Sequence, residues 1–183
     1  MRTRPWRAGL LAVPLLLAGC AGADAATQPA GTPAPPVAAS DTAPTDTAAM
    51  ICGPDITGDV GRELSLPAPP PTTSTWADQL FTCDYQLPMG RLVLSVEQSP
   101  SGPDAARFFD GKRAQLGDTA PAAGLGERAF ATPTGTVVVI KDAMTLTVDA
   151  TALPPVFGDN GQRRNDFAYE VASVVLGCWT GHE

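Results

Sequence analysis

Few residues in this 183-residue sequence have the types needed for catalysis. The only histidine, His182, is second from the end, where chains commonly fray, so a Ser-His-Asp or Cys-His arrangement would depend on a poorly held residue. Cys178 precedes it by four residues, a spacing that metal ligands share on one helical face. Gly181 disfavours a rigid helix there, and no other thiol or imidazole is near in the sequence. We therefore predict no such catalytic residues, no metal site and no cofactor.

Carboxylates are the remaining groups that could do acid and base chemistry. Asp142 and Asp149 lie near opposite ends of one predicted hairpin, and Glu127 lies beside a predicted turn. Paired carboxylates can act as general acid and base when their surroundings separate their pKa values. The same positions suit solvated turn and edge residues, which is the interpretation we favour. A hydrolase-type enzyme that uses carboxylates alone is kept as an alternative function.

Aromatic side chains are the other candidates for a site, in this case one of recognition. Trp76 follows a proline-rich stretch, residues 67–75, that we predict to be a polar loop. An aromatic residue beside such a loop can anchor a partner, or it can cap the core. Tyr85, in a predicted strand, is the second candidate recognition residue.

The amino-terminal segment predicts export. Three arginines in the first seven residues precede a short apolar run, residues 8–18, which is typical of a signal peptide and too short for a stable membrane-spanning helix. The run ends in Leu17-Ala18-Gly19-Cys20, which resembles the bacterial lipobox. By that resemblance, residues 1–19 are a lipoprotein signal peptide, and Cys20 is lipidated as the signal is removed. The alternative is an ordinary signal peptide whose cysteine is incidental.

Lipidation of Cys20 would determine where the chain resides. Each buried methylene contributes roughly 0.8 kcal/mol, and two acyl chains anchor a protein stably where one does not. We therefore predict attachment to the cell membrane on its extracytoplasmic face. The mature chain would keep 9 of the 12 Lys and Arg residues against 19 Asp and Glu, a net charge of −10. That charge argues against nucleic acid as a partner.

Composition divides the mature chain into two parts. Residues 20–48 are the lipidated cysteine followed by a segment rich in Ala, Pro and Thr, which has too little apolar surface to fold alone. We predict a disordered tether. Residues 49–183 have the usual length of one domain with one core.

The periodicity of residues 49–183 predicts alternating helices and strands. The expected fold is α+β, an antiparallel sheet with helices packed on one face, in the order α-β-β-α-β-β-β-α. The Ser101-Gly102-Pro103-Asp104 segment is a helix-start signal, and Asp142-Ala143 is a tight turn between two strands. The expected helices are 56–64, one beginning near 102, and one after 161; the expected strands are 81–87, one beginning at 92, 128–131, 136–141 and 145–150.

Several short motifs together resemble a small actinobacterial lipoprotein family whose two-cysteine domain has no known function. They are Cys52 before the first helix, Cys83-Asp84-Tyr85 in the first strand, the turn Gly124-Leu125-Gly126-Glu127-Arg128-Ala129, and an amphipathic closing helix. The resemblance covers residues 50–179 in outline. It implies an α+β fold and supplies no catalytic residues.

Three cysteines besides Cys20 lie in a compartment that permits disulfides, which leaves three single pairings open. The resemblance favours Cys52 with Cys83, which would join the first helix to the first strand. Cys178 would then be free on the apolar face of the last helix. A Cys83–Cys178 pairing is the alternative.

The function expected from these observations is that of a non-catalytic envelope lipoprotein. Its partners would be the membrane, through the lipid on Cys20, and either an envelope protein or a small apolar ligand. The carboxylate enzyme and a purely structural envelope component are the alternatives. A pocket would distinguish ligand binding from a structural role.

Overall fold

A computed structural model describes residues 43–158 and 160–179. The predicted signal peptide, Cys20, residues 20–42 of the predicted tether, and His182 lie outside these residues. Within the described ranges, no helix has both the length and the apolar composition needed to cross a membrane.

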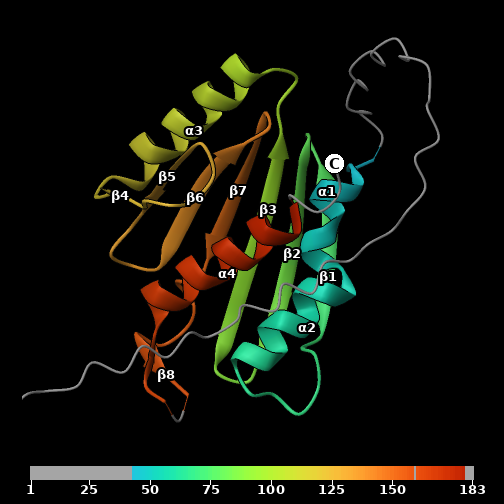
Figure 1. Cartoon of the computed structure of the whole chain (residues 1–183), viewed down its shortest axis with the longest axis vertical. Helices are drawn as coiled ribbons and strands as arrows, with labels where there is room; N and C mark the ends of the chain where they lie inside the picture. Colours follow the sequence, from blue (N-terminus) through green and yellow to red (C-terminus); the bar gives the residue numbers. More distant parts are fainter. Residues whose placement is uncertain (1–42, 159, 180–183) are drawn as a thin grey trace, which may run out of the picture. The chain divides into compact units, whose positions relative to one another are not determined.

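The described residues form one seven-stranded antiparallel sheet, which confirms the predicted α+β class (Figure 1). The strand order across the sheet is β1-β2-β3-β7-β6-β5-β4. Neighbours in sequence are therefore neighbours in space within two meanders, β1 to β3 and β4 to β7, and β3 pairs with β7 where the meanders meet. The strands are β1 Thr72–Ala77, β2 Leu80–Leu87, β3 Gly90–Gln98, β4 Ala120–Pro121, β5 Arg128–Ala131, β6 Thr136–Lys141 and β7 Met144–Asp149.

The helices of the described residues precede, connect and follow the two meanders. They are α1 Asp46–Ala49, the short 3-10 helix η1 Met50–Cys52, α2 Pro54–Glu63, α3 Gly102–Leu116 and α4 Arg164–Trp179. A small hairpin, β8 Val156–Phe157 with β9 Gln162–Arg163, lies just before α4. Long α3 connects the two meanders, and α4 closes the described chain.

Local signals explain where these elements begin and turn. The side chain of Ser101 accepts a hydrogen bond from the backbone N–H of Asp104, so the predicted start of α3 is confirmed. Helix α2 begins at Pro54, whose fixed φ suits the first helical position. Asp142 and Ala143 both have positive φ, 51° and 59°, the backbone that a two-residue hairpin turn requires. The predicted turn between β6 and β7 is therefore confirmed.

The core occupies both faces of the sheet. In β6, Val137 and Val139 pack into the main cluster with α4, whereas Val138 and Ile140 belong to a second cluster with Phe109 of α3. Successive strand residues point to opposite faces. The prediction of helices on one face thus holds for α1, α2 and α4 and is corrected for α3, which covers the other face. The strand residues of the cluster on that face come from β5 and β6: Phe130, Val138 and Ile140.

Two regions were predicted to be irregular and are ordered in the structure. Strand β1 occupies residues 72–77, most of which lie in the predicted 67–75 loop, and it pairs with β2 along its whole length. Helix α1 lies at the end of the predicted tether, where Ala48 is buried and the backbone N–H of Thr45 donates to Oε1 of Gln98 at 2.8 Å. The folded part of the chain therefore begins before residue 49, where the boundary was predicted.

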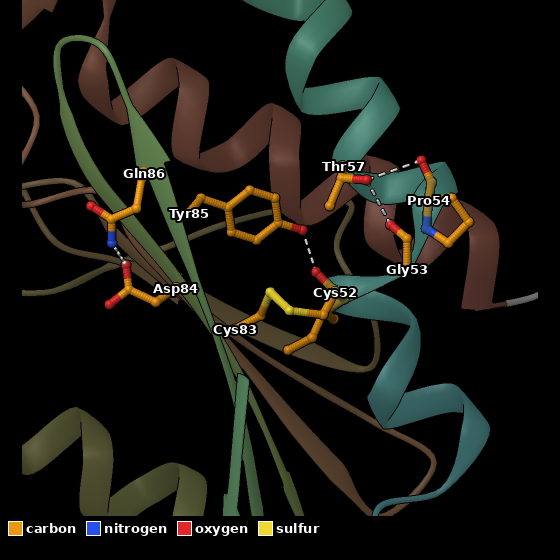
Figure 2. The surroundings of a disulfide bond; sticks show 9 residues. Cys52, Gly53, Pro54, Thr57, Cys83, Asp84, Tyr85 and Gln86 are labelled. Carbon is orange, nitrogen blue, oxygen red and sulfur yellow. Dashed lines mark hydrogen bonds between the residues drawn. A yellow bond between two sulfur atoms is a disulfide. The ribbon is translucent and has the colours of Figure 1, made fainter. Parts of the chain in front are cut away.

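A disulfide joins Cys52 and Cys83, which confirms the predicted pairing (Figure 2). The two Cα atoms are 5.5 Å apart, within the usual range for such a bond. The hydroxyl of the neighbouring Tyr85 donates to the backbone carbonyl of Ile51. Two adjacent inward-facing residues of β2 thus hold the segment that leads into α2.

Candidate functional site

A cleft of about 360 Å³ lies between α2 and α4. Figure 1 shows both helices, α2 in cyan and α4 in red, on the same side of the sheet. Each helix contributes residues spaced three and four apart, so one face of each helix is turned toward the cleft. Its lining is Ile56, Asp59, Val60, Arg62, Glu63, Glu170, Val171 and Val174, and we call it the α2–α4 cleft.

The floor of the α2–α4 cleft is apolar. Ile56, Val60 and Val171 belong to the main core and are at most 4% exposed. Val174, one turn beyond Val171, is 38% exposed. A partly exposed valine above a buried aliphatic floor gives a ligand apolar surface to cover, because burying such surface is favourable.

The rim of the α2–α4 cleft carries charge. Asp59 and Arg62 form an ion pair within α2 and neutralise one another. Glu63, at the end of α2, and Glu170, on α4, both line the cleft, and the charge of Glu63 acts on Glu170. The side-chain amide of Gln162 donates to Oε2 of Glu170 at 2.8 Å. The two glutamates therefore leave net negative charge beside an apolar floor.

The surroundings of Glu170 disfavour its ionised form. Burial raises the pKa of Glu170 above its ordinary value, and the negative charge of nearby Glu63 raises it further. The hydrogen bond from Gln162 opposes this shift. Asp166, one turn earlier on α4, adds a smaller repulsion. Glu170 therefore takes up a proton at a higher pH than an ordinary glutamate does.

The structure separates the two aromatic recognition candidates from the α2–α4 cleft. Tyr85 is fully buried on the inner face of β2, so its expected role in recognition is corrected to a role in the core. Trp76 is half-buried and packs against the main core from β1, opposite Phe81. It occupies the core-capping position that the sequence offered as its alternative.

The three carboxylates proposed from the sequence do not form one cluster, because Glu127 lies beside Asp142 whereas Asp149 lies at the other end of β7. Asp149 accepts hydrogen bonds from the backbone and hydroxyl of Thr151, whereas Asp142 lies in the turn at the other end of β7. Glu127 accepts from the backbone N–H of Asp142 at 3.0 Å. These contacts hold turns, which is the interpretation that the sequence favoured.

The described residues do not form the thiol–imidazole or metal site that was considered from the sequence. Cys178 is a free, half-buried thiol on α4. The described residues contain no group of three or more His, Cys, Asp or Glu side chains placed to hold a metal ion. His182 lies outside these residues.

Glu63 and Glu170, the acidic pair that lines the cleft, were not among the residues predicted from the sequence. They are 107 positions apart, on helices that nothing in the sequence pairs with each other. Helix periodicity shows only that each glutamate borders its helix's apolar face. Both side chains are exposed, whereas carboxylates that do acid and base work are usually tuned by a water-excluded site.

The α2–α4 cleft has to be interpreted from its own geometry. The resemblance to small actinobacterial lipoproteins rests on short motifs and stays a prediction. No protein-family model, no curated protein and no solved structure matches the chain.

Proposed function

We propose that this chain is a lipid-anchored, extracytoplasmic binding module that takes up a small, largely apolar ligand in the α2–α4 cleft. The observation that carries the proposal is the cleft itself, with its aliphatic floor and the half-exposed Val174. Its volume of about 360 Å³ lies at the lower end of the range for small-molecule sites, roughly 300–1,000 Å³.

Two features favour a small ligand over a protein partner. Protein interfaces usually need a contiguous apolar patch. The large apolar side chains exposed in the described part of the chain are distributed over α3, β8 and α4: Leu116, Val156, Tyr169 and Val174. Val174 alone among them lines the α2–α4 cleft. A concave apolar site with a few polar groups at its rim is the usual form of a small-molecule site.

Filling the mouth of the α2–α4 cleft is expected to weaken ligand binding. Val174→Trp should reduce the affinity for octanol, a neutral aliphatic probe, by about tenfold, because the indole would occupy the space that the probe needs. The measurement is an NMR titration of the isotope-labelled parent and variant, following the amides of Val60 and Val171, which both proteins share.

Val156→Trp is the matched control, since Val156 is 57% exposed on β8 and does not line this cleft. It should bind octanol as the parent does. Octanol shifts that map away from α2 and α4 would contradict the assignment of this cleft.

The anchoring part of the proposal depends on Cys20. A Cys20→Ala variant expressed in its own host should lose palmitate labelling and move from the membrane fraction to the soluble fraction, because no acyl chain would hold it. Retention of the variant in the membrane fraction, at the level of the parent, would overturn the anchor.

A further inference from the structure

We propose that the ligand of the α2–α4 cleft is an amphiphilic amine, with its aliphatic part on the floor and its ammonium group between Glu63 and Glu170. This inference rests on the proposed function, since it specifies the ligand of the same cleft. The chemistry that points to it is the combination of an apolar floor with two acidic side chains from different helices.

The charges around the cleft are complementary to a single cation. Asp59 is already paired with Arg62, and Asp166 lies 3.9 Å from Arg163. Glu63 and Glu170 both line the cleft, where the charge of Glu63 raises the cost of ionising Glu170. An ammonium group between them would replace this repulsion with two charge-assisted hydrogen bonds.

The apolar floor gives the ligand its second requirement. At about 30 Å³ for each non-hydrogen atom, the share of a water molecule in the liquid, a cleft of about 360 Å³ accommodates roughly a dozen such atoms. Ile56, Val60 and Val171 would contact the aliphatic chain, and Val174 would cover its side. A small hydrophilic cation would leave this floor uncovered, whereas a neutral hydrocarbon would leave the two glutamates without a partner.

The test compares three probes that share one chain and differ in their head group: octylamine, octanol and octyl sulfate. A primary alkylamine is protonated at neutral pH, as a lysine side chain is. We expect octylamine to bind about three- to tenfold more tightly than octanol, the range for two partly exposed charged contacts, and octyl sulfate to bind more weakly than both. The preference for the amine should shrink as salt is added.

The same preference should depend on pH with a defined sign. The pKa of Glu170 is raised, and below that pKa its carboxyl is protonated and offers the ammonium no charge. As the pH rises through that pKa, the preference of the protein for octylamine over octanol should increase. Calorimetry in two buffers with different heats of ionisation should show proton release when octylamine binds at a pH close to the pKa of Glu170.

Two double variants make the assignment specific. Glu63→Gln/Glu170→Gln should abolish the preference for octylamine over octanol. Asp118→Asn/Glu127→Gln, which removes two exposed carboxylates outside the cleft, should keep it. Circular dichroism of both variants checks that they fold.

Each other outcome has a distinct meaning. Equal binding of octylamine and octanol would overturn the amine while leaving the apolar cleft in place. Loss of the preference for octylamine in the Asp118→Asn/Glu127→Gln control would also overturn the amine proposal. The attraction would then come from the net charge of the protein. Binding of none of the three probes would overturn the proposed function itself.

Discussion

Removing the Cys52–Cys83 disulfide should lower the free energy of unfolding by roughly 3–4 kcal/mol. The bond joins residues 31 positions apart, so it forbids the unfolded chain many conformations that the reduced chain can adopt. The variant is Cys52→Ala/Cys83→Ala, which leaves no unpaired thiol at the site. Urea titration under oxidising conditions measures the loss. We also expect a steeper dependence on urea, because the unconstrained unfolded chain exposes more surface.

Cys178→Ala is the matched control for the disulfide variant. Cys178 is free and half-buried, so its truncation should cost about 1 kcal/mol or less. If the disulfide variant and the parent unfolded at the same urea concentration, the disulfide would not stabilise the folded protein relative to the unfolded chain. A larger loss in Cys178→Ala than in the disulfide variant would also contradict this account.

Much of the fold was predictable because local signals and the apolar pattern agree. The β6–β7 hairpin is an example: two runs of β-branched residues flank Asp142-Ala143, and the observed β6, Thr136–Lys141, has the predicted bounds. Helix α3 begins at the predicted cap, Ser101. In both places a residue's neighbours in sequence are sufficient to determine its conformation.

Other elements depend on partners that are distant in the sequence. The residues of β1, Thr72–Ala77, follow three prolines and show little apolar alternation, so the strand exists because β2 provides hydrogen-bonding partners along it. Helix α4 shows the same limit. Cys178 was predicted on its apolar face and is only half-buried, whereas its buried stripe includes Ala172, Leu176 and Trp179. How a helix turns toward its sheet is determined by packing.

The candidate site was less predictable than the fold. Ile56 and Val60 lie in the helix predicted at 56–64, and Val171 lies in the helix predicted after 161, but periodicity does not distinguish a cleft wall from the core. Glu63 and Glu170 become a pair only when α2 and α4 pack side by side. A site assembled from two surface helices leaves no motif in the sequence, because neither helix contains enough of it.

The second cluster, between α3 and the far face of the sheet, depends on one aromatic ring. Phe109 is 2% exposed and contacts Phe130 edge to face, with 5.0 Å between ring centroids. The guanidinium of Arg128 lies 4.6 Å from the ring of Phe109 and also pairs with Asp110. Ala105, Val138 and Ile140 complete the cluster. Since the main core lies on the other face, α3 has few other apolar contacts that hold it in place.

Phe109→Ala is therefore expected to lower the free energy of unfolding by about 3–5 kcal/mol, the usual cost of removing a buried phenylalanine. Phe108→Ala is the matched control: the ring is half-buried and lies 5.6 Å from the ammonium of Lys112, so its loss should cost about 1 kcal/mol. Hydrogen exchange should show the α3 amides of Phe109→Ala losing protection before those of β2 and β3, because the cluster that fails is separate from the main core. Equal loss of protection in α3 and in the sheet would show that the second cluster does not unfold separately from the main core. Equal destabilisation by Phe109→Ala and Phe108→Ala would show that Phe109 does not hold α3 in place.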